Sequence, residues 1–547
     1  MQITGGQAMA RQLVAEGVEV IFGLPGVQLD WGLDGLARDG GSIRFITTRH
    51  EQATTYMADG YSRASGKVGV AMVVPGPGVL NSLAGLATAY ACNSRVLLIA
   101  GQVPSPLIGE GRGVLHEIPD QTAILRSLTK WTGRARTAAE VPGVLHEAFR
   151  QLGSGRPRPV AVELPPDVLQ EVGECEVVPP AAPEPPLAPD PGLVEEAARL
   201  LAAARFPVIA VGGGVIVSGA TQAVLSLAEL LGAPVLRSSF GHSAAPDAHA
   251  LVAPTQQTPR VLAHADVVFA IGTRFFNRRG TPMPVPEGAK RIALNIDDGD
   301  TIGAHTYDLA LIGDAELGTR QVEEAVRRLG PRGTGTAGRD VVREAKTAAA
   351  DDLERLEPQM SYVHALRAGL PDDGVVVNDL TQVGFVAELG FEVRDRFSFV
   401  TAGYQGTLGF GFPTALGFKV GAPERDVVVL AGDGGFGYAL QELSTARANQ
   451  IGVTVLLFVD GWWGNVRRTQ QEDFGGRYLG TTLVNPDFVD LAHSFGVHAW
   501  AAGDPDRVMR LLRERRGASD PALIVIPQGE VPSPWDQIIW TTASATR

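Results

Sequence analysis

Asp433 and Asp460 constrain the fold most, because each follows a run of apolar and β-branched residues. The first run is VVVLAGDGG at 427–435 and the second is VTVLLFVDG at 453–461. Between them, residues 437–450 carry apolar side chains at three-residue spacing and predict a helix. A strand, a helix and a strand within about 30 residues form a right-handed βαβ unit, which places the ends of both strands at one edge of a parallel sheet.

This edge is where open α/β sheets bind their ligands. Gly434 and Gly435 open the predicted helix, so backbone N–H groups there can bind phosphate oxygens, and Mg²⁺ can bridge the same oxygens to two carboxylates. A GDGG segment alone is most often a turn. A second strand-terminal acid 27 residues after Asp433 is much harder to obtain from turns, so the pair predicts a metal site for a phosphorylated ligand.

Length and composition describe a multidomain globular protein. The chain has 547 residues, more than one hydrophobic core sustains, and 45% of them are hydrophobic. The net charge of −13 argues against nucleic acid or an anionic membrane as the main partner, and no stretch reaches the roughly 18 apolar residues of a membrane span. Cys92 and Cys175 suggest neither a metal site nor a disulfide framework, so the predicted compartment is the reducing cytoplasm.

Two boundaries divide the chain. A proline-rich segment at 178–192 is typical of an extended linker, and PRGTGTAG at 331–338 marks the second boundary. Each of the three resulting parts contains five apolar runs that alternate with helical stretches, which predicts an α/β fold of three doubly wound parallel-sheet domains. Their similar size hints at an old duplication. The predicted domains are 1–178, 193–330 and 355–530, followed by a tail at 531–547.

Three further segments indicate a function only when they are considered together with Asp433 and Asp460. They are RHEQAT at 49–54, GPGVLNS at 76–82 and GTLGFGFPTALG at 406–417. Alone, Glu51 is explained as an acid in a first helical turn and Asn81 as part of an ordinary helix start. Together with the GDG motif and the later acid, the segments resemble the thiamine diphosphate-dependent enzymes of the acetolactate synthase, benzoylformate decarboxylase and benzaldehyde lyase group.

The resemblance extends from about residue 1 to 530 and implies a pyrimidine-binding domain, a middle Rossmann-like domain and a diphosphate-binding domain. It implies that Glu51 is the catalytic acid, which hydrogen-bonds the aminopyrimidine of the cofactor and so promotes loss of the thiazolium C2 proton. Leu408 would lie beneath the cofactor and hold it bent. The residues implied to bind thiamine diphosphate are Pro77, Asn81, Thr381, Gln382, Gly406, Leu408, Gly432, Gly434 and Gly435.

The implied Mg²⁺ ligands are Asp433, Asp460 and the backbone carbonyl of Trp462. Family members usually have asparagine where this chain has Asp460. Oxygen ligation survives that change, but the added negative charge beside a diphosphate is unfavourable unless the cation and the helix N-terminus offset it. We therefore expect a strict dependence on a divalent metal.

Candidate substrate residues follow from the same resemblance. Gln28 lies in a loop that meets substrate across the subunit boundary in relatives, and His116, Glu117 and Gln121 fall where relatives place polar pocket residues. Trp463 follows the metal loop and is predicted to form a wall of the pocket. A surface loop explains the polar residues equally well, and a structural tryptophan pair explains Trp463.

The middle domain leaves flavin binding open. Gly212, Gly213 and Gly214 follow a predicted strand, but Val217 replaces the last glycine of a G-x-G-x-x-G motif. Some relatives bind FAD in this domain and others leave it empty. The segment IGTRFFNRR at 271–279 resembles part of the FAD binders, whereas the surrounding match is incomplete. FAD therefore remains an uncertain cofactor.

The resemblance implies a thiamine diphosphate- and Mg²⁺-dependent carboligase that decarboxylates a 2-oxo acid and transfers the activated acyl unit to a second carbonyl, as acetolactate synthase does. One alternative is a decarboxylase or a 2-hydroxy ketone lyase. Another, from a different class, is a non-catalytic nucleotide-binding or regulatory homologue. Relatives build the cofactor site between two subunits, so a homodimer or homotetramer is expected.

Overall fold

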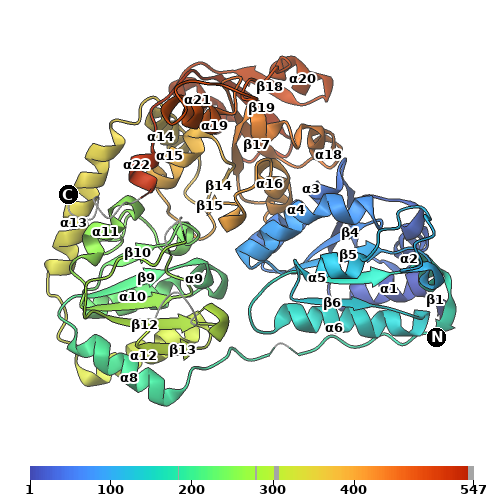
Figure 1. Ribbon diagram of the computed structural model, residues 1–547, viewed down its shortest axis with the longest axis horizontal. Coiled ribbons are helices and arrows are strands. Elements are labelled where there is room, and N and C mark those ends of the chain that lie inside the picture. The colour runs from blue at the N-terminus through green and yellow to red at the C-terminus, as the bar shows by residue number, and fades with distance from the viewer. Residues whose placement is uncertain (183, 277–279, 301–306, 540–547) are drawn as a thin grey trace.

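The computed structural model describes residues 1–182, 184–276, 280–300 and 307–539, and it contains three α/β domains that each surround a parallel sheet (Figure 1). The predicted fold class is confirmed. Buried valine, isoleucine and leucine side chains fill many positions of the central strands, as expected for sheets covered on both faces. None of the helices in these ranges has the length and apolar character that crossing a membrane requires.

The N-terminal domain has a six-stranded sheet with the order β3-β2-β4-β5-β7-β6. A small antiparallel pair, β1 with β8, lies outside it. The strands are β1 (Gln2–Thr4), β2 (Val20–Gly23), β3 (Arg44–Thr47), β4 (Gly69–Val73), β5 (Val96–Gly101), β6 (Trp131–Arg134), β7 (Val160–Leu164) and β8 (Val172–Glu174). The helices are α1 (Gly5–Ala15), α2 (Asp30–Asp39), α3 (Glu51–Ser65), α4 (Pro77–Cys92), α5 (Gln121–Arg126), α6 (Val141–Gly153) and α7 (Pro166–Gln170).

The middle domain has a five-stranded parallel sheet with the order β10-β9-β11-β12-β13. Figure 1 shows the long proline-rich segment that connects it to the N-terminal domain. The strands are β9 (Pro207–Val211), β10 (Val235–Arg237), β11 (Val267–Ile271), β12 (Lys290–Asn295) and β13 (Leu309–Ile312). The helices are α8 (Pro191–Ala203), α9 (Gly213–Ser218), α10 (Thr221–Leu231), α11 (Thr258–Leu262), α12 (Ala315–Leu329) and α13 (Ala337–Leu353).

The C-terminal domain has a six-stranded sheet with the order β15-β14-β16-β17-β19-β18. Its strands are β14 (Val375–Asn378), β15 (Phe399–Val400), β16 (Val427–Gly432), β17 (Val453–Val459), β18 (His498–Ala501) and β19 (Ala522–Pro527). Its helices are α14 (Gln359–Gly369), α15 (Gln382–Gly390), α16 (Gly411–Gly421), α17 (Asp433–Phe436), α18 (Leu443–Ala448), α19 (Gly464–Glu472), α20 (Phe488–Ser494), α21 (Pro505–Glu514) and α22 (Trp535–Ile538).

The first and third sheets share one topology. Numbered by their own chain order, the strands of both run 2-1-3-4-6-5 across the sheet. Equivalent strands therefore carry equivalent loops: α3 follows the second strand of the first sheet and α16 follows the second strand of the third. This correspondence supports the duplication that the similar domain sizes suggest.

The predicted βαβ unit is confirmed, but its single helix is wrong. β16 and β17 are parallel neighbours in the sheet. The segment between them forms the short α17, a 3₁₀ turn at Leu440–Glu442 and then α18. In this segment polar groups bind the N-terminal domain: the Tyr438 carbonyl accepts from Gln52, and Glu442 accepts from two backbone N–H groups there. The helical spacing of apolar residues gives no information about such contacts between residues that are distant in the sequence.

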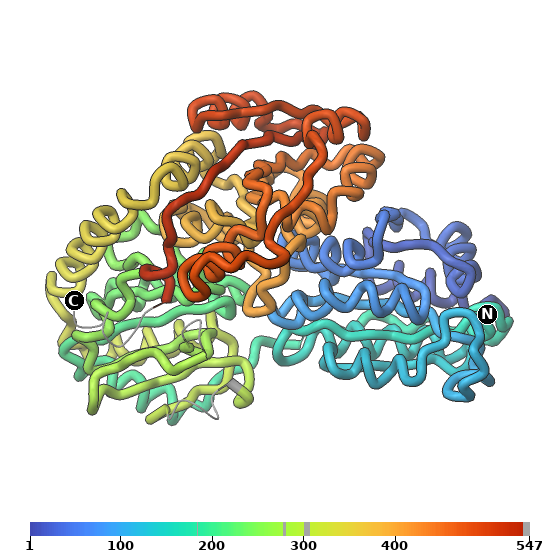
Figure 2. Tube along the Cα trace, turned by 45° about the horizontal axis from the view of Figure 1, so that its top comes forward, coloured from blue at the N-terminus to red at the C-terminus, as the bar shows by residue number. Residues whose placement is uncertain are grey.

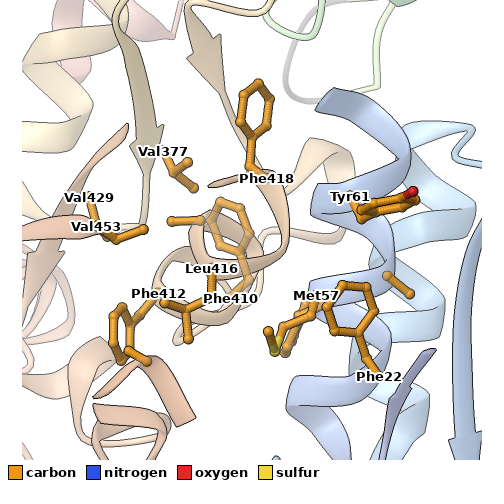
Figure 3. Packing of buried hydrophobic residues seen from close by; sticks show 14 of the residues in the cluster. Phe22, Met57, Tyr61, Val377, Phe410, Phe412, Leu416, Phe418, Val429 and Val453 are labelled. Atoms are coloured by element: carbon orange, nitrogen blue, oxygen red, sulfur yellow. The ribbon is translucent and has the colours of Figure 1, made fainter. Parts of the chain in front are cut away.

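Helices α3 and α16 join the N-terminal and C-terminal domains through a close crossing. A Cβ added at Gly60 would lie 2.0 Å from the Thr414 carbonyl oxygen, and one at Gly417 would lie 1.9 Å from the Met57 carbonyl oxygen. Buried aromatic and aliphatic side chains from both domains, including Met57 and Phe410, surround the crossing (Figure 3). The crossing therefore fixes α3, which begins at Glu51, against the C-terminal domain.

The segment after β19 returns toward the middle domain (Figure 2). There α22 packs Trp535 against Phe385, with ring centroids 4.8 Å apart. The Trp535 indole donates to Asn465 in α19, and Gln537 donates to the Asp352 carbonyl in α13. The described part of the predicted tail is thus anchored beside α19, which follows the loop of Asp460.

Candidate active site

Asp433 and Asp460 end neighbouring strands, and their loops are tied together. Asp433 is only 4% exposed. Its Oδ2 accepts the Gly461 N–H at 2.9 Å and the Asn485 side-chain amide at 2.6 Å. Asn485 was not predicted, because it lies before α20 in an ordinary polar turn and only the folded chain brings it to Asp433. These bonds fix the Asp433 carboxylate beside the second acidic loop.

Asp460 is half-buried, and its Oδ1 accepts the Trp462 N–H at 2.8 Å. Burial, with a smaller contribution from the negative charge of Asp433, raises the pKa of Asp460 to about 6. A cation between the two carboxylates would offset both effects. Among the described residues, no cluster of three or more His, Cys, Asp or Glu side chains could hold a metal by itself. Two carboxylates on glycine-rich loops therefore fit Mg²⁺ shared with phosphate oxygens.

The glycines of the first acidic loop allow close packing. A Cβ at Gly434 would lie 2.5 Å from the Trp463 ring. Thr381 and Gln382 begin α15 beside this loop, and both are 7% exposed. The Gln382 Oε1 atom is buried without a hydrogen-bond partner among the described groups. The Gln382 side chain lies beside Gly464 of the second acidic loop. A buried amide oxygen without a partner at this place fits a bound ligand that donates a hydrogen bond to it.

The Leu408 turn is held by a buried acid that the sequence did not reveal. Leu408 is half-buried and lies between two glycines with left-handed backbone, Gly406 (φ 56°) and Gly409 (φ 78°). The Asp379 carboxylate accepts the N–H groups of Gly409 at 3.1 Å and Gly411 at 3.3 Å. Burial raises the pKa of Asp379 to about 6 against the lowering effect of these bonds. Asp379 therefore determines how the turn presents Leu408.

Glu51 is the first residue of α3, and only 9% of its surface is exposed. Its Oε2 accepts the Asn81 side-chain amide at 3.0 Å. Asn81 and Pro77 both lie in the first turn and a half of α4, and both are exposed. The structure thus brings together these three predicted residues at the edge of the N-terminal sheet.

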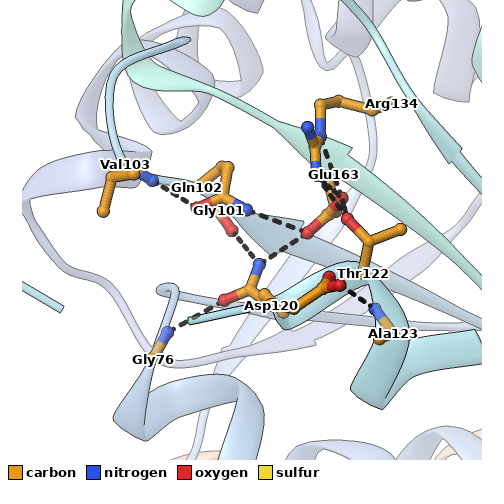
Figure 4. Close-up of polar contacts among 10 residues, drawn as sticks. Gly76, Gly101, Gln102, Val103, Asp120, Thr122, Ala123, Arg134 and Glu163 are labelled. Atoms are coloured by element: carbon orange, nitrogen blue, oxygen red, sulfur yellow. Dashed lines mark hydrogen bonds and ion pairs between the residues drawn. The ribbon is translucent and has the colours of Figure 1, made fainter. Parts of the chain in front are cut away.

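Gln121 is buried beneath this edge. It belongs to a polar network that includes Gly76, Gly101 and Glu163, which Figure 4 labels. Its Oε1 accepts the Gly76 N–H at 3.0 Å, and its Nε2 donates to the Gly101 carbonyl and to Glu163. Glu163 is fully buried and forms an ion pair with Arg134. Both ends of the Gln121 amide are therefore in use, and the side chain fixes the turn that precedes Pro77.

The other candidate pocket residues divide between two domains. His116 Nδ1 lies 3.1 Å from Gln28 Oε1, and Gln28 also donates to the Leu115 carbonyl. Glu117 accepts backbone N–H groups from Gly111 and Gly113, so its carboxylate shapes the loop. In the C-terminal domain, the Trp463 ring packs edge-on against Tyr438, with centroids 6.3 Å apart.

The glycine turn of the middle domain lines a cavity of about 260 Å³ between the three domains. Arg95, Arg158 and Arg274 also line this cavity, and none of the candidate active-site residues does. A Cβ at Gly212 would lie 2.5 Å from the Gly272 carbonyl oxygen, so packing between two loops already requires glycine there. Residues 277–279 of the FAD-like segment lie outside the described residues. FAD stays an open prediction.

Comparison with known proteins decides the family. Models of three thiamine pyrophosphate enzyme domains match the chain in order: the N-terminal TPP binding domain at 3–124, the central domain at 194–322 and the C-terminal TPP binding domain at 379–526. A probable 2-ketoarginine decarboxylase of Pseudomonas aeruginosa is 34% identical over 95% of this chain and 93% of its own length. The chain belongs to the thiamine pyrophosphate enzyme family.

Other relatives of this thiamine pyrophosphate enzyme are acetolactate synthases. A probable acetolactate synthase large subunit of Methanocaldococcus jannaschii is 33% identical over 95% of this chain and 91% of its own length. The acetolactate synthase isozyme 3 large subunit of Escherichia coli is 32% identical over 90% of this chain and 89% of its own length. The predicted resemblance and the thiamine diphosphate cofactor are confirmed. The roles of individual residues remain predictions.

Proposed function

We propose that this thiamine pyrophosphate enzyme is a Mg²⁺-dependent carboligase of 2-oxo acids. It decarboxylates one 2-oxo acid and transfers the remaining acyl unit to a second carbonyl compound. The bound cofactor supplies the nucleophilic carbon for this chemistry. One observation carries the proposal: the C-terminal sheet offers two tied acidic loops for a metal and diphosphate, and the matching edge of the N-terminal sheet offers the buried Glu51.

The C-terminal domain holds the phosphate end of the cofactor in this proposal. Asp433, Asp460 and the Trp462 carbonyl bind Mg²⁺. The turn glycines and α15 bind the diphosphate and exclude water from it, and Leu408 supports the ring system from below. The residues in contact with the diphosphate are Gly432, Gly434, Gly435, Thr381 and Gln382, and Gly406 permits the Leu408 turn.

The N-terminal domain holds the reacting end. Glu51 exchanges a proton with the aminopyrimidine ring, and the Asn81 amide orients its carboxylate. Pro77 borders the ring, and Gln121 contributes by fixing the turn before Pro77. Gln28, His116, Glu117 and Trp463 surround the 2-oxo acid.

The complete site requires a second copy of the chain in this proposal. Exposed apolar residues stand directly beside three predicted site residues: Val27 (61% exposed) beside Gln28, Leu80 (44%) beside Asn81, and Leu115 (64%) beside His116. Such side chains are typical of a surface covered in an oligomer. We infer a homodimer or homotetramer with the sites at the interface. Sedimentation analysis should show at least a dimer, and activity of a monomer at high dilution would contradict it.

Product analysis tests the reaction itself. With pyruvate and Mg²⁺, a carboligase forms acetolactate, whereas a decarboxylase releases acetaldehyde. The decarboxylase relative favours keeping the second outcome as the alternative, with lyase activity on 2-hydroxy ketones beside it. A non-catalytic homologue would bind cofactor and turn over none of a panel of pyruvate, branched and aromatic 2-oxo acids.

We also propose a cytoplasmic location. Cys92 and Cys175 are both free thiols, which supports a reducing compartment. Cell fractionation checks this, and recovery of the protein outside the cytoplasmic fraction would contradict it.

A further inference from the structure

Glu442 is a fully buried acid that reaches from the C-terminal domain into the N-terminal domain. Both of its carboxylate oxygens accept the Arg49 N–H, at 3.0 and 3.1 Å, and Oε1 also accepts the His50 N–H at 3.1 Å. Thr445 donates its hydroxyl to the same carboxylate at 2.6 Å. The two N–H groups belong to the residues immediately before Glu51. Glu442 thus holds the backbone that delivers the predicted catalytic acid.

A further contact between the C-terminal domain and the start of α3 lies directly after Glu51. The Gln52 side chain donates to the Tyr438 carbonyl at 2.7 Å, so the residue after Glu51 is also fixed by the C-terminal domain. Tyr438 and Glu442 follow the Asp433–Gly435 turn by only a few residues. One short segment therefore forms the predicted diphosphate turn at its beginning and orients Glu51 at its end.

We propose that Glu442 is a positioning residue for Glu51 and that it links the two cofactor sites of a dimer. This inference rests on the proposed function, in which Glu51 of one chain serves the cofactor held by its partner. Glu442 and Glu51 belong to the same chain. A chain therefore uses its C-terminal domain to bind one cofactor and, through Glu442, to orient the acid that activates the other.

At the same interface, residues of the N-terminal domain also hold the loop of the C-terminal domain that carries Leu408. The Tyr56 hydroxyl in α3 lies 3.3 Å from the Thr407 hydroxyl, directly before Leu408. Arg63 in the same helix donates to the Thr401 carbonyl at 2.7 Å, in the loop that leads to this turn. The loops that carry Glu51 and Leu408 are thus fixed to one another within a chain, although they serve different cofactors in the dimer.

The first test separates positioning from folding and from cofactor binding. In Glu442→Gln, thiamine diphosphate affinity measured by calorimetry should change less than about threefold, because the metal and diphosphate groups are untouched. The rate at which the C2 hydrogen of the bound cofactor exchanges with deuterium should fall at least about tenfold, because that step depends on the orientation of Glu51. Arg447→Ala, at an exposed position of the same segment, is the control and should leave both quantities unchanged.

Hybrid dimers test the link between sites. We combine a Glu442→Ala chain with an Asp433→Ala chain, using two affinity tags to purify the hybrid. One of its sites then has an intact metal loop from the first chain and a correctly held Glu51 from the second, so about half of wild-type activity should return. A hybrid of Glu442→Ala with Glu51→Ala has no intact site and should remain inactive.

The hybrids distinguish whether Glu442 serves the cofactor of its own chain or that of the partner chain. If Glu442 instead serves the cofactor bound by its own chain, the pattern inverts: the hybrid with Glu51→Ala is active and the hybrid with Asp433→Ala is not. That result, or an unchanged deuterium exchange rate in Glu442→Gln, overturns the inference. If Glu442→Ala fails to fold, Glu442→Gln replaces it in the hybrids. A wild-type chain that binds no thiamine diphosphate would defeat the proposed function instead.

Discussion

The N-terminal and C-terminal domains share one strand order but present different chemistry at the same edge of the sheet. The C-terminal edge carries Asp433 and Asp460 on glycine-rich loops. At the N-terminal edge, the buried acid Glu51 accepts a hydrogen bond from the neutral Asn81 side chain. The comparison shows that one strand order places a candidate binding edge in both domains. In the proposed function, the difference in charge determines that the C-terminal edge binds the diphosphate end of the cofactor and the N-terminal edge its ring.

The largest expected effect comes from removing the first metal ligand. Asp433→Ala should weaken Mg²⁺-dependent binding of thiamine diphosphate at least about 100-fold, because the remaining carboxylate cannot hold the ion alone. Fluorescence of the nearby Trp462 and Trp463 reports the titration. Asp506→Asn, an exposed acid of the same domain, is the control. Equal affinity in the two variants would remove the metal role from this edge.

Glu51→Gln tests the other edge. The change removes a proton-exchanging carboxyl group and keeps the shape, so turnover should fall about 100- to 10,000-fold while cofactor affinity changes little. Steady-state kinetics at saturating cofactor measure the effect, with the exposed Glu174→Gln as control. Unchanged turnover would remove the catalytic role from Glu51.

The crossing that joins the two domains predicts a stability effect. Gly60→Val should lower the free energy of unfolding by about 3 kcal/mol, because the new side chain meets the backbone of α16. Gly143→Ala, in α6, is the matched control: a Cβ there meets nothing within 4 Å, so helix propensity should stabilise the protein by about 0.5–1 kcal/mol. Denaturant unfolding measures both. An unchanged free energy of unfolding in Gly60→Val would show that α3 and α16 can move apart without loss of stability.

A smaller, pH-dependent effect is expected at Asp379. Its pKa in the folded protein is raised from 3.8 to about 6, so the folded state binds the proton more tightly than the unfolded chain does. Its contribution to stability is therefore fully present below about pH 4 and is lost as the pH rises through about 6. The difference between wild type and Asp379→Asn should change by about 1–2 kcal/mol between about pH 4.5 and 6.5. A difference independent of pH would contradict this.

Sequence patterns predicted the strands whose residues are buried in an uninterrupted run. The strands that they did not predict have partly exposed residues. All fifteen apolar runs contain strands, but β6, β18 and the small pair β1 and β8 were missed. β6 and β18 occupy the same edge position in the two equivalent sheets. Edge strands pair on one side only and need no uninterrupted apolar run, as the half-exposed β6 residues show. The domain boundaries themselves remain a prediction.

Residues of the candidate site could be predicted from the sequence where a single loop carries a recognisable motif. Asp433, Asp460 and Glu51 each follow a strand, and strand ends meet at a known edge. Asn485, Asp379 and Glu442 were missed because each acts through backbone or side-chain contacts with residues far away in the sequence. Their own surroundings in the sequence are ordinary, so only the folded chain reveals them.

The central claim is that two acidic loops hold a metal-bound diphosphate. A calorimetric titration of the full chain with thiamine diphosphate, with Mg²⁺ and then after exhaustive chelation, tests it most directly. We predict saturable binding of one cofactor per chain with Mg²⁺ and its loss after chelation. Binding that is absent with Mg²⁺, or that is equally strong without any divalent metal, would contradict the account.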